Sequence, residues 1–143
     1  MAPIILMGPQ LPKTPSMLVK PESDISWIYG IKEALARTPN GVGLAAPQIG
    51  INEQVAYIWT HRKYGYFIIN AEIVWASPQH VLGIEGCLSY PGLTGSVSRS
   101  RAISVNYYDE NWIKHNIRTE GLEARIIQHE MDHFSAICQI AKD

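Results

Sequence analysis

The sequence predicts an α+β fold in which mostly antiparallel sheets pack around a central helix near the C-terminus. Three observations carry this prediction. A short helical pattern follows the N-terminal segment, several short apolar runs occupy the middle of the chain, and a longer helical stripe comes last. Strands grouped between two helices favour this class over alternating parallel units. The 143 residues are about enough for one domain, and we expect residues 1–143 to form a single one.

The N-terminal part divides into an irregular segment and a helix. Prolines cluster within residues 1–22, which predicts an extended, irregular lead-in. Residues 24–37 then place their apolar side chains on one helical face, so a helix is expected there. Pro39 ends it, and Asn40-Gly41 forms a turn signal.

The middle of the chain predicts strands. Short apolar or aromatic runs lie at residues 55–59, 66–69 and 73–75, separated by polar links. Residues 102–108 alternate in polarity and lead through a polar turn into residues 112–119. That pair is therefore expected to form a β-hairpin.

The last element is the clearest. A stripe of residues recurs at steps of three or four: Leu122, Ile126, His129, His133, Ile137 and Ile140. This spacing predicts one continuous helix of about 18 residues. Two histidines stand in the middle of an otherwise apolar stripe, so this helix is the place to look for chemistry.

Composition excludes several classes of function. Apolar residues make up 46% and charged residues 17%, which is typical of a globular protein and not of a disordered one. The formal net charge of -1 provides no basic field for nucleic acid or an anionic membrane. No apolar run approaches the ~18 residues of a membrane span. Two cysteines are too few for a disulfide framework, which indicates a reducing compartment such as the cytosol.

His129 and His133 form the motif H-E-x-x-H with Glu130 between them. On a helix, residues four apart lie about 6 Å from one another on one face, so two imidazoles can bind one metal ion. Glu130 would then act as a general base beside it. The alternative is a pair of histidines that are merely buried or solvated.

A third ligand must lie upstream, because only ten residues follow His133 and none fits the downstream spacings. Cys87 is the best candidate, since it lies in the glycine-containing segment 85–89, where a tight backbone can aim a thiolate. A role as a small core residue is the alternative. Other rivals are His61, His80 and His115. Cys138 lies beyond the pair, at the far end of the helix, and is expected to contribute packing.

One thiolate and two imidazoles leave a coordination position open, which is typical of catalytic rather than structural sites. A water in that position has its pKa lowered to about 7. The expected chemistry is therefore metal-assisted hydrolysis of a carbonyl compound. Zn²⁺ suits these ligands, as do Fe²⁺, Co²⁺ and Ni²⁺.

The glycine-containing segment 41–48 permits a ligand to approach the backbone closely. Gln48 ends it and offers an amide N–H that can donate to a developing oxyanion. The alternative is a turn followed by a packed strand of small residues.

Segments 41–48, 85–89 and 129–133 together resemble peptide deformylase, whose motifs G-x-G-L-A-A-x-Q, E-G-C-L-S and H-E-x-x-H occur in this order. The resemblance is to short members, some of them phage-encoded, that lack a C-terminal extension. It implies one catalytic domain that removes the N-formyl group from the initiator methionine of new polypeptides and releases formate. The metal, Fe²⁺ or Zn²⁺, would be bound by Cys87, His129 and His133. The catalytic groups would be Glu130 as base and acid, with Gln48 and the Leu88 N–H as oxyanion donors.

The resemblance also implies a substrate site and partners. The substrate-binding residues would be Gly41, Val42, Gly43, Leu44, Gly86, Leu122, Arg125 and Ile126. We expect the head of Arg125 to lie in water at the pocket mouth. The partners would be N-formyl-methionyl peptides and nascent chains, with transient proximity to the ribosome. No nucleic-acid or membrane partner is expected, and the protein is expected to be a monomer in the cytosol of a bacterium or of a phage-infected bacterium.

Supporting residues and departures from the family can also be read. Glu85 and Arg99 match a charged pair that braces the cysteine loop, and Asp132 is placed to orient a histidine. Phe134 and Ala136 replace a common leucine and glycine, so the helix end is expected to differ in shape. The competing functions are another metal-dependent amidase or peptidase, and a non-catalytic module that binds formylated peptides.

Overall fold

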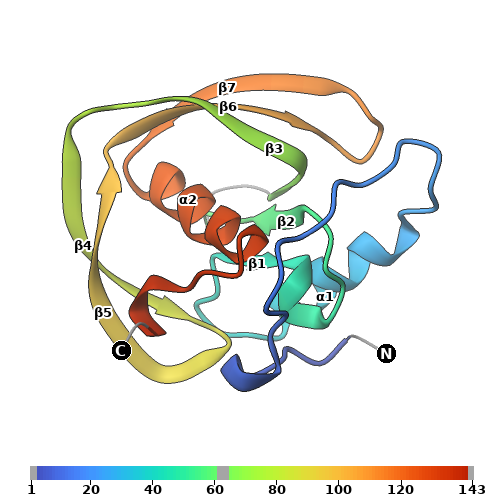
Figure 1. Cartoon of the computed structure of the whole chain (residues 1–143), viewed down its shortest axis with the longest axis horizontal. Coiled ribbons are helices and arrows are strands. Elements are labelled where there is room, and N and C mark those ends of the chain that lie inside the picture. Colours follow the sequence, from blue (N-terminus) through green and yellow to red (C-terminus); the bar gives the residue numbers. More distant parts are fainter. Residues whose placement is uncertain (1–2, 61–64, 142–143) are drawn as a thin grey trace.

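The computed structural model describes residues 3–60 and 65–141, and its central feature is a helix enclosed by two antiparallel sheets. Figure 1 shows this helix, α2, between the hairpin β6–β7 and the ribbon β4–β5. The α+β class expected from the sequence is confirmed. Within the described residues, no helix is both long and apolar enough to cross a membrane.

The larger sheet has five strands in the order β1-β2-β3-β6-β7, all paired antiparallel. Its strands are β1 (Gly43–Ala45), β2 (Val55–Ile58), β3 (Tyr66–Ala76), β6 (Ala102–Tyr108) and β7 (Lys114–Glu120). The predicted hairpin is confirmed as β6–β7. The two runs expected at residues 66–69 and 73–75 belong to one strand, β3, whose pairing with β6 is interrupted by bulges. Bulges conceal such continuity, because they break the alternation along the strand.

The smaller sheet is a two-stranded ribbon of β4 (His80–Cys87) and β5 (Tyr90–Ser100). The pairing runs from His80 opposite Ser100 to Cys87 opposite Tyr90, so Cys87 stands at the hairpin tip. Neither strand was predicted. Glycines interrupt both strands and several large apolar side chains on β4 are exposed, so the sequence carries little of the usual alternation.

The first helical region is close to its prediction. A 3₁₀ turn at Ser26–Ile28 leads directly into α1 (Tyr29–Ala36). The Asp24 carboxylate accepts a hydrogen bond from the Ser26 N–H (2.9 Å), which forms an Asx turn just before the 3₁₀ turn.

Helix α2 spans Leu122–Phe134 and is shorter than expected. The prediction of one helix of about 18 residues is wrong, because Ala136 adopts a left-handed conformation (φ 58°) that ends it. The Ile137 N–H donates to the Asp132 carbonyl (2.9 Å) and the Ala136 N–H to that of His133 (3.1 Å). This Schellman-type ending reverses the chain before a 3₁₀ turn at Gln139–Ala141.

The core lies on both faces of the larger sheet. Ile68 on β3 packs with α2, whereas its neighbour Ile69 packs on the side of α1, since strand side chains alternate between faces. The irregular lead-in is confirmed, but it is tied down. The Leu6 N–H donates to the Gln48 carbonyl (2.7 Å), and the Gly8 N–H to that of Ser89 (2.9 Å). It therefore buttresses two segments that the sequence assigns to the site.

Candidate active site

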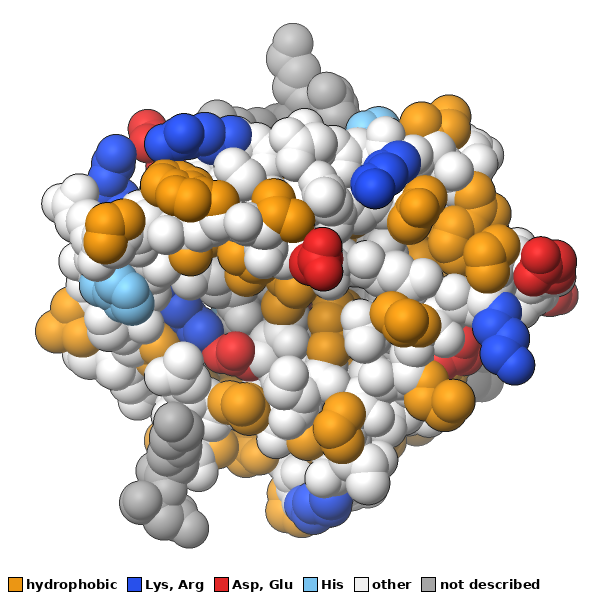
Figure 2. Space-filling model, turned by 45° about the horizontal axis from the view of Figure 1, so that its top comes forward, with side chains coloured by type: hydrophobic (Ala, Val, Ile, Leu, Met, Phe, Trp, Pro, Cys, Tyr) orange, Lys and Arg blue, Asp and Glu red, His pale blue; other side chains and the backbone are white. Residues whose placement is uncertain are grey.

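A cavity of about 400 Å³ opens between the segment before β1, the tip of the β4–β5 ribbon and the N-terminal part of α2. Of the residues that the sequence assigns to chemistry or substrate, its lining contains Gly41, Val42, Gly43, Gln48, Gly86, Cys87, Leu88, Leu122, Arg125, Ile126, His129 and Glu130. Three segments distant in sequence thus meet at one hollow. Figure 2 shows one face of the molecule, where charged side chains of both signs are scattered among apolar ones.

Leu44, one of the predicted substrate-binding residues, offers the cavity no side chain. Its side chain is fully buried in the core on the α1 side and does not line the cavity. The alternation along β1 explains this, because Gly43 faces α2 and its neighbour must then face away. Only the backbone of Leu44 remains available to a substrate.

Glu130 lies on the cavity side of α2, against Gly43. A Cβ at Gly43 would be 2.8 Å from Glu130 Oε2, so the glycine is required for this close approach. Among the described residues, Glu130 Oε1 is a buried atom with no hydrogen-bond partner. Burial raises the pKa of Glu130 to about 7, which suits a group that takes up and releases a proton near neutrality.

His129 is oriented by Glu85. The Nδ1 atom of His129 lies 2.9 Å from Glu85 Oε1, so Nδ1 carries the proton and the lone pair of Nε2 is available to bind a metal. Burial works to lower the pKa of His129, but the hydrogen bond to Glu85 and the negative charges of Glu130 and Glu85 together outweigh it, so the pKa is raised.

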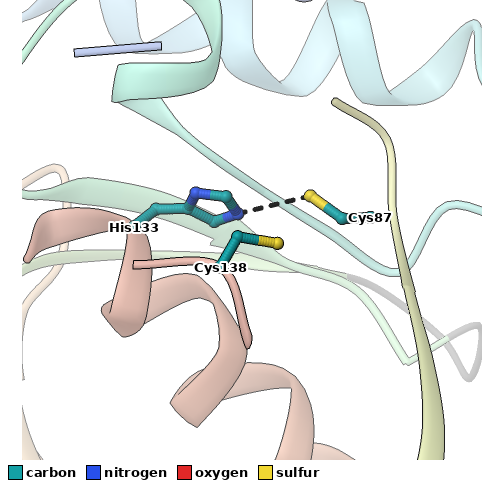
Figure 3. A group of neighbouring side chains, drawn as sticks. All are labelled: Cys87, His133 and Cys138. Atoms are coloured by element: carbon teal, nitrogen blue, oxygen red, sulfur yellow. Dashed lines mark hydrogen bonds between the residues drawn. The ribbon is translucent and has the colours of Figure 1, made fainter. Parts of the chain in front are cut away.

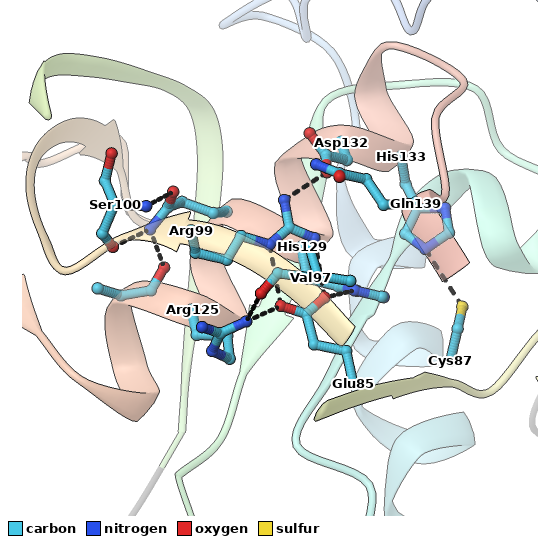
Figure 4. A network of polar contacts seen from close by, with 12 residues as sticks. Glu85, Cys87, Val97, Arg99, Ser100, Arg125, His129, Asp132, His133 and Gln139 are labelled. Atoms are coloured by element: carbon cyan, nitrogen blue, oxygen red, sulfur yellow. Dashed lines mark hydrogen bonds and ion pairs between the residues drawn. The ribbon is translucent and has the colours of Figure 1, made fainter. Parts of the chain in front are cut away.

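Glu85 is the centre of a buried polar network (Figure 4). Arg99 donates to both of its oxygens (2.9 Å each), and Arg125 Nη1 donates to Oε2 (2.6 Å). Burial opposes ionisation of Glu85, yet the hydrogen bonds from Arg99, His129 and Arg125 hold its pKa well below the usual range. The carboxylate therefore stays charged and keeps His129 in place.

Two sequence expectations about this network are corrected. Asp132 does not orient a histidine; its carboxylate pairs with Arg99. The head of Arg125 is not free in water, because it donates to Glu85 and to the carbonyls of Val81 (2.7 Å) and Val97 (3.0 Å). Side chains and backbone carbonyls of the unpredicted ribbon supply these partners, so the sequence alone could not place them. The expected pair of Glu85 and Arg99 is confirmed, and it is buried.

His133 lies one turn further along α2, beside Cys87. Its Nε2 is 3.4 Å from Cys87 Sγ. Burial, followed by the positive charge of its neighbours, lowers the pKa of His133 to about 3, so the imidazole is neutral and able to bind a metal. Among residues 3–60 and 65–141, the potential ligand atoms form two groups that share His133. One holds His129, Glu130 and His133, and the other holds Cys87, His133 and Cys138.

Cys138 is a residue that the sequence analysis placed wrongly. It lies outside α2, after the reversal at Ala136, and its thiol faces Cys87 and His133 (Figure 3). The left-handed residue that turns the chain back is an alanine, so no glycine signalled it.

Gln48 is held with its amide nitrogen toward Cys87. Its Oε1 accepts from the Ala45 N–H (2.9 Å), while its Nε2 lies 3.1 Å from Ser89 Oγ and 3.6 Å from Cys87 Sγ. The donor is thereby aimed at the space in front of the thiol, next to Leu88. Ser89 is a positioning residue to which the sequence assigned no role, although it closes the motif that contains Cys87.

The rival histidines lie elsewhere. His80 is exposed near Ser98 on the ribbon, and His115 pairs with Asp109 at the β6–β7 hairpin. His61 lies outside the described residues. The donor chemistry around α2 fits a divalent ion, since it combines thiol sulfur, neutral imidazole nitrogen and a buried carboxylate oxygen without a partner.

Comparisons with known proteins agree with this arrangement. The family model described as polypeptide deformylase matches residues 1–142. The chain is 43% identical over 114 residues to a peptide deformylase of Roseiflexus castenholzii, and 44% identical over 97 residues to one of Natranaerobius thermophilus. Each match covers 68% of this chain and 62% of the relative, so the chain spans about three fifths of the length of these relatives.

Solved structures match over almost the whole chain. The peptide deformylase of Thermotoga maritima superimposes with a TM-score of 0.90 at 29% identity, covering 99% of this chain and 97% of that one. A probable peptide deformylase from synechococcus phage S-SSM7 gives a TM-score of 0.83 at 32% identity, with 96% and 97% covered. Motifs, fold and whole-chain family match lead to one conclusion: the chain belongs to the polypeptide deformylase family.

Proposed function

We propose that the chain hydrolyses the formyl amide of N-formyl-methionyl peptides and nascent chains, releasing formate and a free α-amino group. The observation that carries this proposal is the buried Glu130 carboxylate, which lines the cavity between two imidazoles and close to the Cys87 thiol. Family membership supports the same reaction.

Cys87, His129 and His133 would hold one divalent ion, Fe²⁺ or Zn²⁺, with Ni²⁺ or Co²⁺ as other occupants. When bound, the ion supplies Lewis acidity and lowers the pKa of a coordinated water. The neutral state of His133 and the orientation of His129 by Glu85 both favour binding, because a ligating nitrogen must be unprotonated. Metal analysis of protein purified without air would identify the ion.

The chain's own groups would then act in sequence. Glu130 takes a proton from the attacking water while the oxygen of that water bonds to the formyl carbon. The Gln48 amide and the Leu88 N–H donate to the oxyanion that forms, each contributing about 3 kcal/mol. Glu130 returns the proton to the departing amine, the carbon–nitrogen bond breaks, and formate leaves. A pKa of about 7 allows Glu130 to perform both transfers.

Substrate would bind along β1, which is an edge strand of the five-stranded sheet. Backbone pairing to segment 41–44 is independent of side-chain identity, which suits an enzyme that processes many proteins. Leu122 and Ile126 line the cavity beside it and would contact the methionine side chain. Arg125 would contribute its stem, because its head is engaged with Glu85.

Residues 1–143 would act as one catalytic domain in the cytosol of a bacterium or of a phage-infected bacterium. A single chain supplies every group named above, which supports action as a monomer. The substrates are nascent chains, so we expect transient proximity to the ribosome.

Formate release from formyl-Met-Ala-Ser tests the proposal, with acetyl-Met-Ala-Ser as the control substrate. We expect the wild type to release formate, and Glu130→Ala to lose about 10²–10⁴-fold in rate while retaining its metal. Cleavage inside the peptide would indicate a peptidase instead. Binding of the formylated peptide without turnover would indicate a non-catalytic module.

A further inference from the structure

Cys138 is brought to the metal site by the turn that ends α2. Ala136 reverses the chain, and the following 3₁₀ turn packs against β5. A hydrogen bond from Gln139 Nε2 to Asp132 Oδ2 (3.5 Å) helps to fix this segment against the helix. The backbone is thus fixed on both sides of Cys138.

The distances match those of a ligand set. The ligand atoms of Cys87, His133 and Cys138 all lie within 4.8 Å of one another, and Cys87 Sγ is 3.4 Å from His133 Nε2. Two such atoms bound to one tetrahedral ion lie about 3.5 Å apart, given bonds of about 2.3 Å to sulfur and 2.0–2.1 Å to nitrogen. Little movement is therefore needed for all three to contact one ion (Figure 3).

Cys138 also lies on a different side of the site from the substrate cavity. His133 and Cys138 line a smaller cavity of about 70 Å³, whereas Glu130 and Gln48 line the larger one with His129. A ligand from this rear side leaves the position that faces Glu130 to water if the ion takes five ligands, a number that catalytic zinc sites reach in some transition states.

We propose that Cys138 is a further ligand of the metal ion, so that two thiolates and the imidazoles hold it. The inference rests on the proposed metallohydrolase site. A second thiolate makes the ion harder to lose and, by donating charge to it, less acidic. The consequence is an enzyme that retains its metal better at some cost in rate.

Cobalt substitution tests this inference directly. The near-ultraviolet sulfur-to-cobalt absorption, measured per bound Co²⁺, rises with the number of thiolates. We expect Cys138→Ala to lose about half of this absorption. Zinc affinity, measured by competition with a chromophoric chelator, should fall at least about tenfold, since loss of a side chain that merely orients a ligand already costs that much.

The controls separate ligation from packing. Cys138→Leu restores apolar volume without a ligand and should match Cys138→Ala in its cobalt spectrum. Ile137→Ala, in the same small cavity, should keep the wild-type spectrum. An unchanged absorption per cobalt in both Cys138 variants would overturn the inference.

Formate release measured on the same samples distinguishes the two proposals. If the cobalt spectrum of the wild type indicates two thiolates but no formate is released, the proposed hydrolase activity is overturned and Cys138 remains a ligand. If the wild type releases formate but its cobalt spectrum is the same as that of the Cys138 variants, only the assignment of Cys138 as a ligand is overturned.

Discussion

The two imidazoles of α2 are one helical turn apart and meet opposite surroundings. His129 donates to Glu85, within a network of buried charges, and its pKa is raised. His133 faces thiols, and burial lowers its pKa to about 3. One motif thus gives an imidazole oriented by a carboxylate and an imidazole kept neutral by desolvation. Substitutions around His129, the charged half of the site, and around His133, the thiol half, should therefore have different effects.

The largest expected effect is on the charged half. Glu85→Gln removes the buried carboxylate that pairs with Arg99, whose side chain is only 4% exposed, and leaves Arg99 with only the less buried Asp132. Breaking a buried ion pair in this way costs about 3–5 kcal/mol. Urea unfolding of the metal-free protein should show this loss.

The matched control is Glu120→Gln, which breaks the exposed pair with Arg101. Its free energy of unfolding should fall by no more than about 1 kcal/mol. Equal losses in the two variants would contradict the assignment of Glu85 as the centre of a buried network.

The next largest effect is on catalysis, through the Glu130 carboxylate that lies between the two imidazoles. Gly43→Ala introduces a methyl group 2.8 Å from Glu130 Oε2, which must move. Crowding of this kind costs about 1–3 kcal/mol, so we expect kcat/KM for formyl-Met-Ala-Ser to fall about 10–100-fold while metal content is kept.

Gly95→Ala on β5 is the control, because it makes the same substitution at a glycine that has room for a methyl group. Its Cβ would lie 3.5 Å from Ile140 Cγ2, an ordinary contact. If Gly43→Ala were as active as Gly95→Ala, the close approach to Glu130 would have no catalytic meaning.

The third effect is on the pH dependence of the free energy of unfolding of the metal-free protein, in which the two histidines are expected to differ. His133 is neutral when folded, so it lowers stability increasingly as pH falls from 6.5 towards about 3, by up to ~1.4 kcal/mol per pH unit. His133→Gln should therefore flatten the decline in stability on acidification.

His129 has the opposite sign, because its pKa is raised. Its contribution is fully present below pH 6.5 and is lost as pH rises through the folded value. His129→Gln should remove stability at low pH and little at high pH. Urea unfolding between pH 4.5 and 8 measures both slopes, and identical slopes would contradict the distinction between the two histidines.

The smallest effect concerns the end of α2. Ala136 holds a left-handed conformation that glycine adopts freely, so Ala136→Gly should raise the free energy of unfolding by about 1 kcal/mol. At the end of α1, Ala36→Gly should instead lower it by about 0.5–1 kcal/mol. Thermal unfolding of both variants checks these signs, and a loss of stability in Ala136→Gly would count against the Schellman-type ending.

The sequence predicts features that depend on residues close together in the chain better than contacts between distant residues. His129, Glu130 and His133 are fixed by local helical spacing, and the β6–β7 hairpin by a short turn. Glu85 and Arg125, in contrast, meet across 40 positions through a ribbon whose strands have no clear alternation.

Two further features, the burial of the Leu44 side chain and the position of Cys138, each depend on the conformation of one short segment. The burial of Leu44 depends on which face of β1 meets α2, and segment 41–48 gives no indication of this. The return of Cys138 depends on a positive φ at an alanine, where a glycine would have given the signal. Such features are set by tertiary packing, so spacing alone could not reveal them.

The most direct test of the account is the coordination of a bound ion. A crystal structure of the protein loaded with one equivalent of Zn²⁺ should place the ion about 2.0–2.1 Å from Nε2 of His129 and of His133, and about 2.3 Å from Cys87 Sγ. A water should lie on the side of Glu130. An ion that does not contact Cys87, or one whose cavity side is closed by protein atoms, would contradict the account.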